Sequence, residues 1–132
     1  MPTDTPAPQV SKTARWTSYV MTALTAAVLV MSGVMKLMKP AAVVQGFAKF
    51  GYPEALIVPL GIVEIACALL YVVPRTSVLG AILVTGYLGG ATATNYRVGE
   101  SWWPTVLIGV LVWGGLFLRN HGIRALIPLR KD

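Results

Sequence analysis

One carboxylate stands inside a long apolar segment of this sequence. Glu64 lies about nine residues into the run from Ala55 to Val73. A charged side chain near the centre of a membrane costs at least about 2.5–3.5 kcal/mol, so such residues usually face other helices and are paired or functional. Burial favours the neutral acid, and a neighbouring cation favours the carboxylate. The chemistry expected of Glu64 is therefore acceptance of a proton or a hydrogen bond.

Two basic residues are predicted to reach Glu64. Lys36 and Arg97 each close an apolar run, and helical side chains lean toward the helix N-terminus. In antiparallel helices both cations would lean into the membrane while Glu64 leans toward them, across an axial gap of about 12 Å. We expect Lys36, Glu64 and Arg97 to converge in one half of a bundle. The alternative is that both cations extend to the headgroups and that a protonated Glu64 bonds to Tyr87 or Thr25.

Small residues precede Arg97 on one helical face. Gly86, Gly90, Ala93 and Arg97 fall at positions i, i+4, i+7 and i+11, and small-xxx-small spacing lets membrane helices approach closely. We predict a helix-packing surface at Gly86, Gly90 and Ala93, which suits a homodimer. The same face could also form the wall of a ligand groove, and the two interpretations do not exclude each other; Gly86 and Tyr87 lie about level with Glu64.

Four apolar runs position these residues. They are bounded by charges, prolines or aromatic residues and cover about 16–36, 55–73, 76–96 and 103–118. A membrane helix needs roughly 20 residues; the fourth run is short, and Trp102 and Trp103 can extend it at the interface. The fold class predicted is all-α, an integral membrane four-helix bundle. The link after the first run is read as a short interfacial helix ended by Gly51 and Pro53.

The rest of the chain divides into three regions. A polar leader, predicted to be disordered, covers residues 1–14, the four-helix transmembrane domain covers 15–119, and a basic cytoplasmic tail covers 120–132. The first run could also be a signal peptide, but it is longer than the usual apolar region and passes directly into Lys36. We therefore expect an uncleaved first helix.

Composition supports a membrane protein. Of 132 residues, 55% are hydrophobic and 12% charged, and the mean hydropathy is +0.67; soluble domains carry about 25% charge. The net charge of +6 indicates orientation and lipid contact, and no nucleic-acid partner is expected. On one side of the membrane the sequence places seven basic residues: Lys12, Arg15, Arg75, Arg119, Arg124, Arg130 and Lys131. On the other it places four: Lys36, Lys39, Lys49 and Arg97. Both termini are therefore predicted to be cytoplasmic.

No self-contained catalytic or redox centre is visible in the sequence. Cys67 is the single cysteine and His121 the single histidine, so a dithiol cycle within the chain is excluded and no metal site is expected. No intrinsic cofactor is predicted, and whether the protein is an enzyme stays open.

Three segments resemble the DoxX-like family. They are SGVMKL (Ser32–Leu37), GIVEIACALLYVVPRT (Gly61–Thr76) and GAILVTGYLGGATATNYRVG (Gly80–Gly99). The resemblance implies a four-helix bundle of the inner membrane with diverse functions. Some members resemble the membrane subunit of a thiosulfate:quinone oxidoreductase, and others associate with redox-defence enzymes. Lys36, Glu64 and Arg97 match polar positions of the family pattern, whereas many relatives carry histidine in place of Asn95.

These observations leave three hypotheses for function. The first is a scaffold or membrane subunit of a larger assembly. The second is a quinone-linked redox component with a bound quinone or lipid and a redox partner protein, in which Glu64 accepts a proton or hydrogen bond. The third, the alternative, is a small proton-coupled transporter that uses Glu64. The candidate ligand-binding or buried polar cluster comprises Lys36, Glu64, Tyr87, Asn95 and Arg97.

Overall fold

The chain folds into helices joined by short connections. The computed structural model describes residues 11–127 and residue 129. Its α-helices are α1 (Lys12–Met38), α2 (Ala41–Phe50), α3 (Ile57–Val72), α4 (Ser77–Arg97), α5 (Trp103–Arg119) and α6 (His121–Leu126). Single 3-10 turns, η1 (Glu54–Leu56) and η2 (Pro74–Thr76), lead into α3 and α4.

The start of α1 differs from the leader predicted over residues 1–14. The hydroxyl of Ser11 accepts a hydrogen bond from the backbone N–H of Ala14 at 3.1 Å, which is the usual N-cap interaction of a serine. The helix therefore begins at Lys12, and residues 12–14 belong to it. Residues 1–10 of the predicted leader lie outside the described residues.

The link between the first two long helices forms α2. Gly51 ends this helix with a positive φ of 80°, a backbone conformation that costs glycine little. Its N–H donates to carbonyl oxygens of the last turn of α2, those of Phe47 and Ala48. One aromatic residue of the helix, Phe47, is buried, so α2 lies against the bundle.

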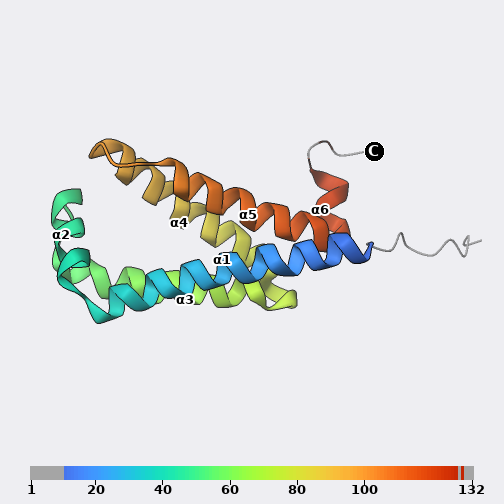
Figure 1. Ribbon diagram of the computed structural model, residues 1–132, viewed down its shortest axis with the longest axis horizontal. Coiled ribbons are helices and arrows are strands. Elements are labelled where there is room, and N and C mark those ends of the chain that lie inside the picture. Colours follow the sequence, from blue (N-terminus) through green and yellow to red (C-terminus); the bar gives the residue numbers. More distant parts are fainter. Residues whose placement is uncertain (1–10, 128, 130–132) are drawn as a thin grey trace, which may run out of the picture.

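The four long helices form an antiparallel bundle (Figure 1). Around the bundle α1 packs on α3, α3 on α4, α4 on α5 and α5 back on α1. In Figure 1 the α1–α3 pair and the α4–α5 pair meet near α6 and diverge toward α2. The bundle therefore has a packed end near α6, and a splayed end near α2 that leaves room between the pairs.

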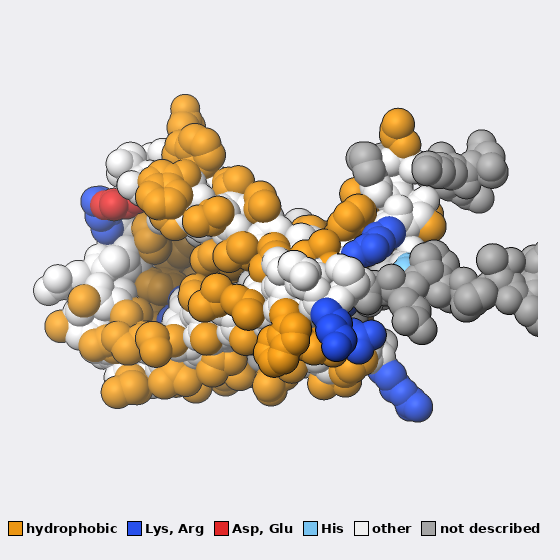
Figure 2. Space-filling model, turned by 45° about the vertical axis from the view of Figure 1, so that its right-hand side comes forward, with side chains coloured by type: hydrophobic (Ala, Val, Ile, Leu, Met, Phe, Trp, Pro, Cys, Tyr) orange, Lys and Arg blue, Asp and Glu red, His pale blue; other side chains and the backbone are white. Residues whose placement is uncertain are grey.

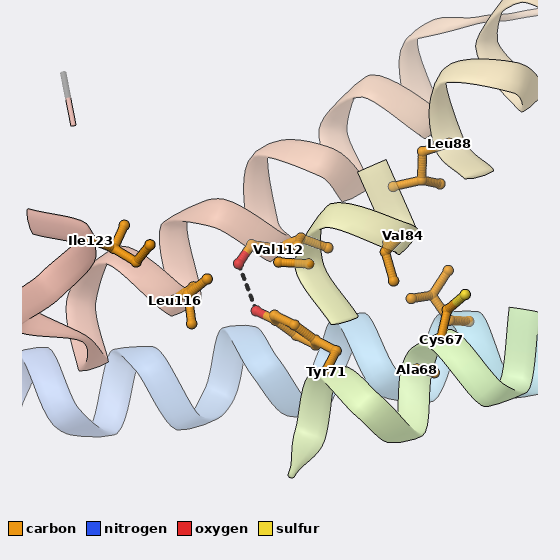
Figure 3. Packing of buried hydrophobic residues seen from close by; sticks show 10 residues of the cluster. Cys67, Ala68, Tyr71, Val84, Leu88, Val112, Leu116 and Ile123 are labelled. Atoms are coloured by element: carbon orange, nitrogen blue, oxygen red, sulfur yellow. Dashed lines mark hydrogen bonds between the residues drawn. The ribbon is translucent and has the colours of Figure 1, made fainter. Parts of the chain in front are cut away.

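The packed end holds the main core (Figure 3). Tyr71 of α3 is fully buried, and its hydroxyl donates to the carbonyl oxygen of Val112 in α5 at 2.6 Å. Ser18 of α1 donates to the carbonyl of Gly115 in α5 at 3.0 Å. Because lipid is as apolar as these side chains, close packing and such hydrogen bonds, rather than release of water, hold membrane helices together.

The tail predicted over residues 120–132 contains a helix that the sequence interpretation missed. Asn120 caps α6 by accepting a hydrogen bond from the N–H of Ile123 at 3.1 Å, and Ile123 is buried in the core. Arg124 donates to the carbonyl oxygens of Phe117 and Leu118, which are acceptors left open at the end of α5. Residues 128 and 130–132 of the tail are outside the described part.

Glycines bring two helix pairs into close contact. A Cβ built at Gly61 of α3 would lie 2.8 Å from the carbonyl oxygen of Gly33 in α1, and one at Gly80 of α4 would collide with the backbone of Tyr71 in α3. The predicted packing surface on α4 is different, because no atom of the described chain lies within 4 Å of a Cβ built at Gly86 or Gly90. Within the chain, close helix contacts therefore occur at Gly61 and Gly80 and not at the glycines of the predicted surface on α4.

Among the residues that the structure describes, three segments are long and apolar enough to cross a membrane: Lys12–Met38, Glu54–Val72 and Pro74–Arg97. The apolar helix Trp103–Arg119 is shorter, with 17 residues, or about 25 Å at 1.5 Å per residue. The predicted all-α four-helix membrane bundle is confirmed as the fold class.

Candidate functional site

A cavity of about 520 Å³ lies between the diverging helix pairs. Most of its wall is apolar, with Leu29 from α1, Leu60 from α3, Leu88 from α4 and Ile108 from α5. Figure 2 shows a hollow on the side of the molecule near its α2 end, with hydrophobic side chains on its walls. The cavity is therefore open to the surroundings of the bundle and suits a lipophilic molecule.

A polar cluster lies in the wall of this apolar cavity. The ammonium Nζ of Lys36 is 2.7 Å from Oε2 of Glu64, and the hydroxyl of Tyr87 donates to the same Oε2 at 3.0 Å. Lys36 also donates to the hydroxyl oxygen of Ser32 at 2.8 Å. The side chains of Glu64 and Lys36 are 4% and 14% exposed. The structure thus brings together Lys36, Glu64 and Tyr87, with Ser32 as a fourth member; we call these four residues the polar cluster.

Helix packing places Lys36 beside Glu64. At Gly61 an added Cβ would lie 2.9 Å from the Cβ of Lys36, so the absence of a side chain at Gly61 lets this part of α1 lie directly on α3. Glu64 follows Gly61 by three residues and therefore shares its helical face. Tyr87 joins from α4, and Lys36 Nζ is 5.9 Å from the centre of its ring.

Unused hydrogen-bonding capacity remains in the polar cluster. A lysine ammonium has three N–H donors, and Lys36 uses two of them, on Ser32 and Glu64. Oε1 of Glu64 makes no hydrogen bond to any residue between 11 and 127. Because the ion pair has no net charge, the cluster offers one donor and one acceptor to a polar group without attracting an ion of either sign.

Arg97 does not join Glu64, and this part of the predicted convergence is wrong. Its guanidinium donates to the carbonyl oxygen of Phe50 and lies 5.9 Å from the ring centre of Tyr52. The reason is distance along the helix, because Arg97 follows Tyr87 by ten residues, or about 15 Å. The nearer acceptor is the carbonyl at the end of α2, which the helix leaves open.

Some of the remaining predicted residues line the cavity and others do not. Asn95, Gly86 and Gly90 line the cavity, so the glycines form a wall of the cavity instead of an internal packing surface. Ala93 is exposed and does not line it. Thr25, the alternative partner of Glu64, donates instead to the carbonyl oxygen of Met21 at 2.7 Å.

The sequence interpretation missed that α2 and the residues just after it line one end of the cavity. Phe47, Phe50 and Tyr52 line the cavity at this end, with ring centres 6.0–6.3 Å apart. The Tyr52 hydroxyl is 2.7 Å from the hydroxyl of Thr94 in α4, and Lys49 pairs with Glu100. The signal in the sequence is the spacing of Phe47, Phe50 and Tyr52, which places three aromatic residues close together at the end of α2.

A comparison with protein families identifies the fold's relatives. The family model that matches is described as the DoxX-like family, and the match covers residues 20–116. The chain belongs to the DoxX-like family. The matched region includes the whole polar cluster and most of the bundle, and together with the apolar helices it identifies this DoxX-like chain as a membrane protein. No curated protein and no solved structure matches the chain significantly.

Proposed function

We propose that this DoxX-like protein is the membrane subunit of a larger redox assembly and binds a neutral lipophilic molecule, such as a quinone, in its cavity. The observation that carries the proposal is the hydrogen-bonded ion pair of Lys36 and Glu64, with Tyr87, in the wall of an otherwise apolar cavity. Binding sites of this kind combine apolar walls with a few polar groups that orient the ligand.

The charge of the polar cluster favours a neutral ligand. Glu64 already neutralises Lys36 at 2.7 Å, so an anionic headgroup would have to displace a buried carboxylate. A carbonyl oxygen can instead accept the third N–H of Lys36, and a hydroxyl can donate to Oε1 of Glu64. A quinone has a carbonyl in its oxidised form and a hydroxyl in its reduced form. When electrons from a partner protein reduce the quinone, its carbonyl oxygens take up protons from the surrounding water, and Glu64 lies where it can accept such a proton and pass it to the carbonyl oxygen.

The proposal places the source of electrons in a partner protein. The chain has one cysteine, Cys67, which is buried, so it cannot alternate between a dithiol and a disulfide by itself. The role of this chain is then to bind and orient the lipophilic ligand. If the chain binds no ligand, the polar cluster only stabilises the packing of α1, α3 and α4, and the protein acts as a scaffold.

Binding of decylbenzoquinone to the protein in lipid nanodiscs tests the proposal. Gly90 lines the cavity, and a Cβ there meets no atom of another helix within 4 Å in the described part of the chain, so Gly90→Leu adds a side chain where the cavity has space for its Cβ. Gly89→Leu is the matched control, because Gly89 is exposed, has the same free space and does not line the cavity. We expect saturable binding by the wild type and Gly89→Leu.

For Gly90→Leu we expect at least about tenfold weaker binding, which corresponds to about 1.4 kcal/mol. Glu64→Gln should weaken binding as well, because it removes the charge that holds Lys36 in place. Equal binding by Gly90→Leu and Gly89→Leu, or binding no greater than that of empty nanodiscs, would show that the cavity is not a quinone site.

The orientation proposed places both termini in the cytoplasm and the protein in the plasma (inner) membrane. In Figure 1 α1 begins, and α6 lies, at the same end of the bundle. Lys12, Arg15, Arg119 and Arg124 belong to these segments, and basic residues favour the cytoplasmic side. Fusion of reporter enzymes active on only one side of the membrane tests this orientation: a periplasmic signal from either terminus would contradict it.

Proton-coupled transport is the second candidate function. The observation that favours it is that Glu64, a group that can bind and release a proton, lines an open cavity. Transport would require Glu64 to separate from Lys36 and Tyr87 in each cycle. Uptake of a solute by proteoliposomes that depends on a pH gradient and is lost in Glu64→Gln would favour this function over ligand binding in an assembly.

A further inference from the structure

A second cavity, which we call the crevice, lies between α1 and α2. Its volume is about 360 Å³, and it shares Ser32, Lys36, Phe47 and Phe50 with the main cavity. The residues lining only the crevice are Met35 of α1, and Val43 and Gly46 of α2. The two cavities therefore adjoin at Lys36, beneath the aromatic side chains of α2.

The two cavities differ in their polar groups. The main cavity contains the carboxylate of Glu64 and the hydroxyl of Tyr87, neither of which lines the crevice. Polar side chains line the crevice only where it adjoins the main cavity, at Ser32 and Lys36. Because Lys36 turns its ammonium to Glu64, its methylene groups are left to line the path from one cavity to the other.

We propose that the crevice holds the apolar tail of the ligand whose polar head lies at Glu64 and Tyr87. The proposal rests on the function proposed above and specifies its ligand class, a single-chain amphiphile with a neutral carbonyl- or hydroxyl-bearing head. Continuity between the two cavities supports a single occupant that extends through both. The wall residues of the crevice, Met35 and Val43, suit a flexible hydrocarbon chain, since methionine adapts to irregular apolar surfaces.

A glycine in α2 leaves space for the chain. Apart from its chain neighbours and the backbone of α2, no atom of the described residues lies within 4 Å of a Cβ built at Gly46. Gly46 is on the same helical face as Val43 and Phe50, at spacings of three and four residues. A larger side chain at this position would extend into the crevice, which neither Glu64 nor Tyr87 lines. Gly46→Leu therefore separates the site of the tail from the site of the head.

Photolabelling in nanodiscs tests the proposal with a decylbenzoquinone that carries a diazirine at the end of its decyl chain. We expect most of the label that excess decylbenzoquinone prevents to lie in peptides containing Met35 or Val43. In Gly46→Leu this label should be lost, while binding of benzoquinone without a chain is unchanged. Gly89→Leu is the control and should keep the wild-type labelling pattern.

Specific labelling of α4 or α5 peptides in place of α1 and α2 would overturn the proposal, because the tail would then leave the main cavity between the helix pairs. Label in the crevice that excess decylbenzoquinone does not prevent would also overturn it and would indicate a bilayer lipid chain there. Failure of the proposed function is distinguishable, because in that case the wild type shows no competable label at any position and no saturable binding.

Discussion

Replacing Glu64 by glutamine is expected to destabilise the protein through the cation that remains. The substitution leaves Lys36 with its bond to Ser32 but without the carboxylate at 2.7 Å. Removing one partner of a buried ion pair costs about 3–5 kcal/mol. Lys36 is 14% exposed and keeps one hydrogen bond, so we expect the lower end of that range, about 3 kcal/mol in the free energy of unfolding.

A double-mutant cycle separates the interaction from other effects of the substitution. Lys36→Met and Glu64→Leu should each cost about 3 kcal/mol alone, because each leaves one buried charge unpaired. The double variant Lys36→Met/Glu64→Leu should lie within about 1 kcal/mol of the wild type, since well-packed apolar residues replace buried ion pairs at little cost. Independent effects would instead add to about 6 kcal/mol in the double variant. Unfolding in sodium dodecyl sulfate, followed by circular dichroism, measures each free energy.

Additive effects, or a Glu64→Gln variant as stable as the wild type, would refute this reasoning. Either result would favour the alternative in which Lys36 extends to the headgroups and Glu64 is protonated.

Three further predictions use matched substitutions and the same unfolding measurement. Gly80→Ala should destabilise the protein by about 1–3 kcal/mol, because an added Cβ collides with the backbone of Tyr71. The control Gly89→Ala, in the same helix with free space around it, should leave the stability unchanged. Equal effects of the two substitutions would show that α3 and α4 do not pack this closely. Tyr71→Phe removes the hydrogen bond to the Val112 carbonyl and should lower the free energy of unfolding by about 1 kcal/mol. The control Tyr96→Phe, at a residue 73% exposed, should leave it unchanged. An unchanged free energy in Tyr71→Phe would mean that this hydrogen bond does not stabilise the protein. Lys49→Gln breaks an exposed pair with Glu100 and should cost less than about 1 kcal/mol, so a larger loss would show that the pair is essential for holding α2.

Much of the bundle could be predicted because its signals are local. Runs of apolar residues closed by charges predicted the long helices, and Gly51 predicted the end of α2. The tail helix α6 has six residues, too few for a helical pattern, and its place depends on Ile123 reaching the core. Such a contact between distant parts of the chain leaves no local pattern in the sequence.

The candidate site was predicted in part for the same reason. Lys36 and Glu64 could be brought together from helix direction and depth, since each stands in a continuous helix. Arg97 was misplaced because the sequence does not show that α4 diverges from α3 toward α2, or that the carbonyl of Phe50 lies within its reach. Gly86 and Gly90 have the spacing of a packing surface, and the same divergence makes them part of the cavity wall.

Native mass spectrometry of protein extracted gently from its own membrane tests the central claim most directly, because it shows whether the cavity holds a ligand. We predict one bound molecule with the mass of a quinone or another neutral amphiphile on the wild type and on Gly89→Leu, and its loss from Gly90→Leu. A bare polypeptide in the wild type, or the same bound mass in Gly90→Leu, would contradict the proposal that the cavity beside Lys36 and Glu64 is a ligand-binding site.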